Sequence, residues 1–495
     1  MSIAGLDVGT SGCKVVIYDL AGGIIDTARQ AYKEEGTAGN RELDPQVVLD
    51  CVKACLKEVS ARLEERIEAL AIGTLGESIV CIDEQDNILC KSMVTGDKRG
   101  IEEIEDILAE VSRQEVMDIT GLPVSEMFSL PKLLWINKNT SVFKNAKYIF
   151  LYEDYIGYYL TGIRKVSYSS ASRTMAFDIK NKCWSQRLLK LAGISKEQLS
   201  DPVDSGTVLG KIRPEIAAEL GLSPELKIVA GGHDQECAAL GAGVIGPGLG
   251  EDGHGTCEVM NMMLPKLHRT DYILENQLTC VPGMIPDTYL TNIEITTCGI
   301  LMNWFRDCIF SDIRKECEAS GKDFYSYMDK CAAGVQTELL VLPQFGSSGN
   351  PDIDYNTKGL IWGLTIHTQP VEIYRAVKES MAFQIRMAYE VLEPLGIDLE
   401  KIIMTGGGSA SLLTMQIRAD VLGKTMMTMH DNEAGTLGCM IAAAKGLGYY
   451  ASFSEGVARV IKIDKIIEPQ KENKSYYEEK YKKYKKLYKL MHDFK

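Results

Sequence analysis

Two glycine-containing segments carry the side chains best suited to chemistry. Asp234 follows an apolar run, residues 228–230, on a glycine-hinged turn, and a carboxylate in such a place can take a proton from a hydroxyl. Gly255-Thr256 lies a short way downstream and is typical of a turn that holds phosphate. Asp234 could equally cap the helix that follows it, and the two roles are compatible.

The first residues supply a complementary segment, in which two apolar runs, residues 3–6 and 15–18, flank a short polar turn. The turn consists of Gly9, Thr10, Ser11 and Gly12. Its backbone N–H groups and serine hydroxyl can face an anion, while Lys14 adds positive charge and Asp7 can hold a metal ion. The alternative for Lys14 is an ordinary solvated lysine on a strand. Together with the Asp234 turn, this segment predicts phosphoryl transfer.

The composition is that of an ordinary globular protein. At 495 residues, with 45% hydrophobic and 25% charged residues, the chain is long enough for two domains. The net charge of -14 argues against nucleic acid or an anionic membrane surface as the main partner. The 14 cysteines form no repeated Cys-x-x-Cys framework, and the sequence has no signal-like or membrane-length apolar stretch. We therefore expect a soluble, cytoplasmic protein with reduced thiols.

The order of the expected elements indicates the fold class. A hairpin in residues 1–20 and a strand from residue 24 precede an amphipathic helix that opens at Pro45, and a strand at 67–73 follows. Three strands, a helix and a strand favour a ribonuclease-H-like or actin-like domain over a simple alternating α/β sheet. The glycine-dense segment 241–250 is a natural domain boundary.

The second half of the sequence is expected to form a new hydrophobic core, which starts at residues 258–260. It contains a long helix at about 370–392, a strand at 402–404 and a helix at about 412–422. The basic C-terminal tail places its tyrosines on one helix face, namely Tyr477, Tyr481, Tyr484 and Tyr488. This pattern favours a helix that packs on its own domain over one that binds nucleic acid or a partner.

In the order of these motifs, the chain resembles the FGGY family of carbohydrate kinases, which includes xylulose, ribulose, gluconate and glycerol kinases. The polar turn near the N-terminus is similar to the family's phosphate hairpin. Residues 231–235 are similar to its catalytic-base turn, and Gly255-Thr256 to its second phosphate loop. Residues 406–411, followed by 433–435, are similar to its C-terminal signature.

The resemblance implies an α/β fold of two ribonuclease-H-like (actin-like ATPase) domains with the active site in the cleft between them. Residues 1–245 would form the N-terminal domain, which binds the sugar and carries the base. Residues 246–495 would form the C-terminal, nucleotide-binding domain with the tail helix. The implied activity is transfer of the γ-phosphoryl group of ATP, with Mg²⁺, to a hydroxyl of a ketose. A xylulose-like pentulose is the first expectation, and gluconate, erythritol and glycerol are alternatives.

The resemblance also assigns roles to residues. Asp234 would be the general base, and Asp7 with Asp234 would hold Mg²⁺. The phosphate contacts would be Thr10, Ser11, Gly12, Lys14, Gly255 and Thr256. The nucleoside contacts would be Gly299, Asn303, Gly407 and Ser411. The sugar contacts would be Gly76, Glu77, Ser78, Asp97, His233 and Asp234.

Some features leave alternatives open. Gly76-Glu77-Ser78 departs from the Gly-Gln-Met-His of typical xylulose kinases, and Thr95 stands where the family usually has Trp. His233 could be a packing residue instead of a substrate contact. A rival of another class is an actin-like ATPase that acts on a protein partner, and a third is a sugar-sensing pseudokinase. The expected partner is a small sugar or polyol, and the expected state a monomer or homodimer.

Overall fold

The computed structural model describes residues 1–37, 39–268, 270–354 and 356–492. The chain divides into two compact units. The first comprises residues 1–245, 266–291 and 433–461, and the second comprises 246–265, 292–432 and 462–495. One junction, between Ile245 and Gly246, lies within the glycine-dense segment. Among the described residues, no helix is both long and apolar enough to cross a membrane.

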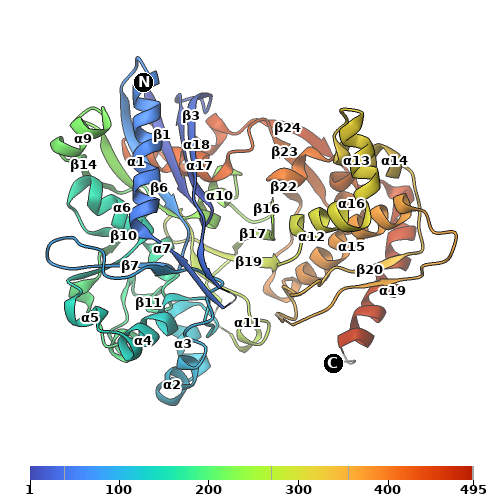
Figure 1. The fold of residues 1–495 in the computed structure, drawn as a ribbon, viewed down its shortest axis with the longest axis horizontal. Coiled ribbons are helices and arrows are strands. Elements are labelled where there is room, and N and C mark those ends of the chain that lie inside the picture. Colours follow the sequence, from blue (N-terminus) through green and yellow to red (C-terminus); the bar gives the residue numbers. More distant parts are fainter. Residues whose placement is uncertain (38, 269, 355, 493–495) are drawn as a thin grey trace. The chain divides into compact units, whose positions relative to one another are not determined.

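The first unit is built on a sheet with the order β14-β15-β6-β1-β2-β3 (Figure 1). The first three strands form an antiparallel meander, and β6 and β15 then run parallel to β1. This is the arrangement that the strand–helix order predicts. The strands are β1 (Ser2–Val8), β2 (Gly12–Tyr18), β3 (Ile24–Ala31), β6 (Ile67–Thr74), β14 (Val208–Lys211) and β15 (Lys227–His233).

Alternating side chains give this sheet two buried faces. On one face, Leu6, Val15 and Ile72 pack with α1 (Pro45–Arg62) and α6 (Tyr152–Thr161). On the other face, Ile3, Val16 and Ala71 pack with α17 (Ala434–Gly446), and α10 (Asp234–Gly241) packs along α17. Because successive side chains of a strand point to opposite faces, strands this apolar need helices on both sides.

Smaller elements surround the first sheet. Its helices are α2 (Glu103–Glu110), α3 (Arg113–Thr120), α4 (Ser129–Asn139), α5 (Val142–Asn145), α7 (Tyr168–Ser172), α8 (Gln186–Leu191), α9 (Pro214–Leu220), α11 (Asp271–Glu275) and α18 (Phe453–Val460). Its short strands are β4 (Glu35–Thr37), β5 (Asn40–Leu43), β7 (Ile79–Ile82), β8 (Ser92–Met93), β9 (Tyr148–Leu151), β10 (Lys165–Ser167), β11 (Phe177–Asp178), β12 (Cys183–Trp184), β13 (Asp201–Val203) and β18 (Val281–Pro282). All 14 cysteines of the chain lie among the described residues, and none of them is in a disulfide bond.

The second sheet runs β18-β19-β17-β16-β22-β23-β24, and from β19 onward it repeats the strand order of the first sheet. Antiparallel β16 and β17 are followed by β22 and β23, which run parallel to β16. The strands are β16 (Leu249–His254), β17 (Glu258–Leu264), β19 (Tyr289–Ile295), β22 (Lys401–Thr405), β23 (Thr425–Met429) and β24 (Ile463–Ile467), and a hairpin pairs β20 (Leu340–Leu342) with β21 (Leu360–Trp362).

The helices of the second unit include the three that the sequence predicts, at α15, α16 and α19. The helices of this unit are α12 (Gly299–Trp304), α13 (Ser311–Ala319), α14 (Phe324–Ala332), α15 (Pro370–Glu390), α16 (Leu412–Leu422) and α19 (Lys474–His492). Tyr477, Tyr481 and Tyr484 of α19 are buried against Phe383 of α15. The tail is therefore a helix that packs on its own unit, as its tyrosine spacing predicts.

Candidate functional site

Three carbonyl groups of the turn between β1 and β2, those of Gly9, Ser11 and Gly12, accept hydrogen bonds from within the protein. Gly9 N donates to the Gly12 carbonyl at 2.9 Å, and the Tyr32 hydroxyl lies 2.6 Å from the Gly9 oxygen and 3.0 Å from the Gly12 oxygen. Tyr32 N donates to the Ser11 carbonyl at 3.1 Å. Because these carbonyl oxygens already accept hydrogen bonds inside the protein, they do not face an anionic ligand that approaches the turn. Thr10 is half-buried and Ser11 is exposed.

A row of charged side chains crosses the sheet beside this turn. Lys14 is the cross-strand partner of both Asp7 and Arg29, so the three side chains lie on one face. Glu433, just before α17, forms ion pairs with Lys14 and Arg29, and Lys14 Nζ lies 3.8 Å from Asp7 Oδ2. Burial raises the pKa of Asp7 to about 6, and the negative charge of Asp234 adds to this increase.

Asp234 is the first residue of α10, directly after β15. The side chain is 31% exposed, and Oδ1 lies 3.2 Å from Nε2 of His233. Burial raises the pKa of Asp234, as do the nearby carboxylates of Glu77 and Glu236, whereas His233 and Arg173 oppose the increase. A carboxylate at a helix N-terminus is also stabilised by the helix dipole.

His233 is held from behind by buried groups. Its Nδ1 lies 2.7 Å from Glu236 Oε2, and its backbone N donates to the Ser169 hydroxyl at 3.0 Å. Burial alone would lower the pKa of His233, but Glu236 and Asp234 outweigh burial and raise it. His233 is thus both a packed side chain and a neighbour of the predicted base.

Glu77 lies close to this group, in a left-handed backbone conformation with φ 60°. Arg173 Nε donates to Glu77 Oε1 at 2.6 Å, and the Thr95 hydroxyl donates to Oε2 at 3.2 Å. Burial opposes ionisation of Glu77, but Arg173 and His233 more than offset it and lower its pKa. A Cβ on Gly76 would lie 2.9 Å from the His233 ring and 3.1 Å from Arg173, so only glycine lets the strand end approach them.

The other predicted sugar residues are buried. Ser78 is fully enclosed. Asp97 accepts hydrogen bonds from Arg99 Nε at 2.9 Å and from the Arg41 backbone N at 2.8 Å. Lys132, fully buried on α4, donates to the carbonyls of Val94 and Met127 at 2.9 and 2.8 Å. Burial lowers the pKa of Lys132 to about 8, against the pull of Glu77 and Asp97.

The sequence-based assignment did not give roles to several residues of this group. Their signal was weak, because a single polar or charged residue in a sequence does not reveal its distant partner. The residues are Arg29, Thr95, Lys132, Arg173, Glu236 and Glu433.

In the second unit, the predicted nucleotide residues gather at the β16–β17 turn. Gly299 N donates to the Gly255 carbonyl at 3.0 Å, and Ile300 N donates to the Thr256 carbonyl at 3.2 Å. A Cβ on Gly299 would collide with the Gly255 carbonyl. The turn carbonyls therefore cap α12, and glycine at 299 permits the close approach.

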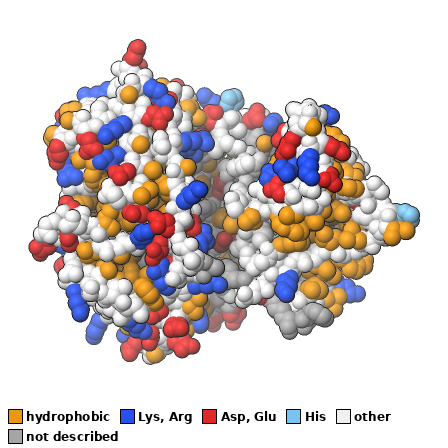
Figure 2. All heavy atoms as spheres, in the orientation of Figure 1, with side chains coloured by type: hydrophobic (Ala, Val, Ile, Leu, Met, Phe, Trp, Pro, Cys, Tyr) orange, Lys and Arg blue, Asp and Glu red, His pale blue; other side chains and the backbone are white. Residues whose placement is uncertain are grey.

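The remaining predicted nucleotide residues lie on neighbouring elements. Asn303 Oδ1 accepts a hydrogen bond from Tyr325 at 2.7 Å. Gly407 opens a 3₁₀ turn after β22, and Ser411 caps α16 by accepting from Thr414 N at 3.1 Å. On the face shown in Figure 2, hydrophobic side chains gather near α12. Two residues of this helix, Ile300 and Trp304, have exposed side chains.

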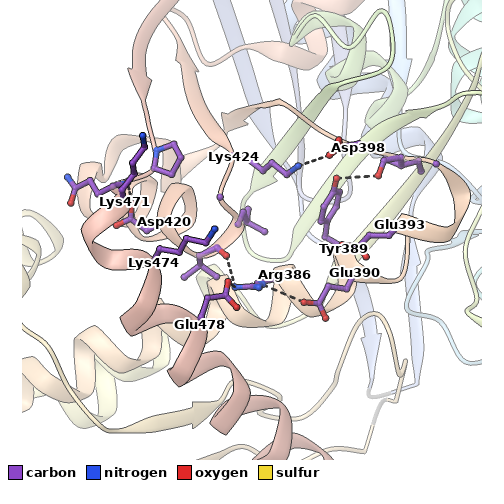
Figure 3. A pocket seen from close by; sticks show the side chains of 17 residues that line it. Arg386, Tyr389, Glu390, Glu393, Asp398, Asp420, Lys424, Lys471, Lys474 and Glu478 are labelled. Atoms are coloured by element: carbon purple, nitrogen blue, oxygen red, sulfur yellow. Dashed lines mark hydrogen bonds and ion pairs between the residues drawn. The ribbon is translucent and has the colours of Figure 1, made fainter.

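A cavity of about 780 Å³ lies at the other end of α16, around its last residues (Figure 3). Ser411 begins this helix of 11 residues, so the cavity lies about 16 Å along the axis from Ser411. Several of the charges that line it form ion pairs. Lys424 pairs with Asp398 at 2.6 Å, and Arg386 pairs with Glu478 at 2.8 Å. None of the predicted site residues lines this cavity.

Two models of protein-family domains match most of the chain. The N-terminal domain model of the FGGY family of carbohydrate kinases matches residues 2–241, and the C-terminal domain model of the same family matches residues 253–447. The chain belongs to the FGGY family of carbohydrate kinases. A xylulose kinase of Staphylococcus epidermidis is 27% identical over an alignment of 500 residues, which covers 98% of this chain and 96% of the relative.

Two crystal structures from Lactobacillus acidophilus, one of a ligand-bound xylulose kinase and one of a gluconate kinase, share the fold. Each is 26% identical with a TM-score of 0.89 and covers 99% of this chain and 98% of its own chain. The FGGY chain described here is therefore a sugar kinase, a phosphotransferase whose acceptor is an alcohol group of a small molecule. Membership in this family decides against an ATPase that acts on a protein partner.

Proposed function

We propose that this FGGY kinase transfers the γ-phosphoryl group of ATP to a hydroxyl of a ketose, with xylulose as the first candidate. Asp234 takes the proton from the attacking hydroxyl. In phosphoryl transfer, the protein mainly positions the reactants and neutralises charge, so one well-placed carboxylate is enough for proton removal.

One observation carries the choice of base. Of the three carboxylates clustered around His233, Glu77 is bonded to Arg173 and Glu236 to His233, and both are buried. Asp234 is 31% exposed, and the contact described for its carboxylate is the one between Oδ1 and His233 Nε2 at 3.2 Å. Its raised pKa also suits a base, because a more basic carboxylate has a greater affinity for the transferred proton.

Asp7 and Asp234 fit a magnesium site. The negative charge of Asp234 contributes to the raised pKa of Asp7, and a bound cation would relieve this repulsion. Both side chains are about one third exposed. Mg²⁺ needs only one or two carboxylates because it keeps several waters. When bound, it would neutralise charge on the phosphates, and Asp7 would hold it.

Each unit carries residues that suit a part of ATP. In the first unit, Lys14 and the turn residues Thr10, Ser11 and Gly12 suit the phosphates, because the turn carbonyls are satisfied internally. In the second unit, Gly255 and Thr256 would take phosphate, and Gly299, Asn303, Gly407 and Ser411 would line the nucleoside. Exposed Ile300 and Trp304 offer an apolar surface to the base.

The sugar contacts fall into two kinds. Asp234, His233 and Gly76 surround the acceptor hydroxyl, while Glu77 shapes the pocket from its bond to Arg173. Asp97 and Ser78 are enclosed, and Asp97 would act by holding the 95–99 loop. Xylulose is supported by the Staphylococcus relative, and a gluconate-like acid by the Lactobacillus gluconate kinase.

The test is release of ADP by the whole enzyme with ATP and Mg²⁺ across ketopentoses, ketohexoses, aldonates and small polyols. Strong stimulation by xylulose or another ketopentose supports the proposal. Stimulation by an aldonate alone would support a kinase but would show that its substrate is a sugar acid and not a ketose. ATP hydrolysis that none of these compounds accelerates would contradict the proposal that the acceptor belongs to one of these compound classes.

A further inference from the structure

A cluster of buried polar side chains lies beneath the β16–β17 turn of the second unit. Arg418 of α16 is 1% exposed, donates to Asp252 at 3.0 Å and to Glu258 Oε2 at 2.8 Å, and also pairs with Glu258 Oε1. Arg418 Nη2 lies 3.2 Å from His254 Nδ1. Cys298 Sγ lies 3.1 Å from His254 Nε2 and 3.3 Å from Glu258 Oε2. The Arg418 cluster is defined as these residues, namely Asp252, His254, Glu258, Cys298 and Arg418.

His254, Glu258 and Cys298 of the Arg418 cluster each adjoin a predicted nucleotide segment, and Arg418 lies on the helix that follows the third such segment. His254 ends β16 and Glu258 begins β17, so the two flank the Gly255–Cys257 turn. Cys298 is the residue before α12, whose first amides bind that turn. Arg418 belongs to α16, which Ser411 caps. One guanidinium thus joins the ends of β16 and β17 to α16, and His254 extends the connection to α12.

The 3₁₀ turn after β22 packs against the same group. Gly406 has φ 74°, and a Cβ there would lie 2.7 Å from the His254 carbonyl oxygen. A Cβ on Gly408 would collide with the His254 imidazole. The position of the His254 ring therefore limits where the Gly407 segment can lie.

The chemistry of the Arg418 cluster excludes a metal site. His254, Glu258 and Cys298 place a nitrogen, an oxygen and a sulfur within 4.8 Å of one another. However, the Arg418 guanidinium can only donate, so His254 Nδ1 accepts and Nε2 carries the proton. A protonated Nε2 that points at Cys298 cannot bind a cation, and the arginine already supplies the positive charge that Glu258 requires.

We propose that the Arg418 cluster is a positioning device that fixes the three nucleotide segments, residues 255–257, 299–303 and 407–411, relative to one another. Its residues set nucleotide affinity without touching the nucleotide. This inference rests on the proposed nucleotide role of these segments. Backbone hydrogen bonds join the first two segments, and the buried ionic cluster ties the third to them through α16, because its specific geometry allows only one arrangement.

The sharpest test uses the contact between Gly408 and His254 in the full-length enzyme. Gly408→Ala should push the imidazole aside and weaken ADP binding, measured by calorimetry without sugar, by about tenfold. In a His254→Ala background the added methyl group has room, so the same substitution should weaken ADP binding by about twofold or less. Equal losses in both backgrounds would overturn the proposal, because the methyl would then act independently of the cluster.

A second comparison separates positioning from stability. Arg418→Met should weaken ADP binding by about tenfold or more while the KM for sugar stays within about twofold. The matched control is Arg375→Met, since Arg375 is also buried in the second unit and pairs with Glu379 at 2.8 Å and with the Tyr477 hydroxyl at 2.6 Å. It should lower the unfolding temperature and leave ADP binding unchanged.

If Arg418→Met does not fold, Cys298→Ala provides the milder variant at the edge of the cluster and should weaken ADP binding by about threefold. Loss of ADP affinity in the Arg375 control equal to that in the Arg418 variant would overturn the proposal. So would a stoichiometric metal ion in purified protein that His254→Ala removes. Because ADP binding is read without turnover, a wild type that binds ADP but phosphorylates no tested acceptor contradicts the proposed function alone.

Discussion

The first hairpin turns of the two sheets occupy the same topological position and treat charge in opposite ways. Beside the β1–β2 turn, the Lys14 and Asp7 side chains are 21% and 32% exposed. Beside the β16–β17 turn, Asp252, Glu258 and Arg418 are at most 1% exposed. Both turns follow the first strand of a meander that continues into parallel strands.

This difference separates charges that can meet a ligand from charges that hold the protein together. A partly exposed lysine beside a turn can exchange its partners for phosphate oxygens at little cost. A buried arginine cannot leave two carboxylates without leaving them unpaired, which is strongly destabilising. We therefore expect substitutions in the first unit to act on chemistry and phosphate binding, and substitutions in the Arg418 cluster to act on geometry and stability.

The largest effect is expected at the base. Asp234→Asn removes the proton acceptor and keeps the shape, so kcat should fall by about a hundredfold or more while ADP affinity changes little. Steady-state kinetics on the sugar identified by the acceptor panel measures both. Glu236→Gln is the matched control, because Glu236 contacts His233 and Ser169 behind the base, and it should cost less. An Asp234→Asn enzyme that keeps more than about a hundredth of the rate would show that the base is elsewhere.

The next effect concerns the pH dependence of stability and arises from His254, which is buried beside the β16–β17 turn. Burial lowers the pKa of His254 from 6.5 to about 4, so below pH 6.5 the unfolded chain takes up a proton that the folded protein refuses. The resulting stability is present above pH 6.5 and declines as the pH falls toward 4, by about 2 kcal/mol between pH 6.5 and 5.

Urea unfolding at pH 5 and 7 tests this slope. In His254→Gln, the number of protons taken up on unfolding between these pH values should be smaller by about one, so the free energy of unfolding should depend less on pH. His430→Gln is the control, because His430 is 73% exposed in the same unit, and its slope should match the wild type. Identical slopes in all three proteins would contradict a neutral buried His254.

A smaller effect compares two cations of the first unit. Lys14→Met should raise the KM for ATP by about tenfold, because the turn loses its nearest positive charge. Arg29→Met should change it by about twofold at most, since Arg29 is 64% exposed and lies one strand farther from the turn. Equal effects would mean that Arg29 also reaches the phosphates.

The smallest effect is expected at Glu433, which pairs with Lys14. Glu433→Gln keeps the side-chain shape and removes the charge that competes with phosphate, so the KM for ATP should fall by about twofold. The change should shrink as salt is added. A rise in KM would show that Glu433 chiefly holds Lys14 in place.

The fold was predictable where local signals agree. Helix α16 begins after Ser411, whose side chain caps it, and ends before Gly423 in a left-handed conformation, and the predicted bounds of 412–422 match the structure. The tyrosine spacing of the tail likewise indicated its buried face. The roles of Asp234, Asp7 and the nucleotide residues remain predictions, as does the division into domains at residue 245.

The partners of buried charges were not predictable. Glu77 and Arg173 are 96 residues apart, and Arg418 and Glu258 are 160 apart. Periodicity and capping act over one or two helical turns, so they say nothing about which distant charges meet. Arg418 lies in a segment whose apolar neighbours predicted a helix, and nothing in that segment distinguishes a buried charge from a solvated one.

The return of α17 to the first unit has a consequence for biosynthesis. This helix covers one face of a sheet whose strands end at residue 233, yet it begins at Ala434. Since a ribosome makes the chain in order, the apolar face formed by Ile3, Val16 and Ala71 must wait for α17 while most of the second unit is being made. Nascent chains that stop before residue 446 would therefore expose this face and depend on chaperones.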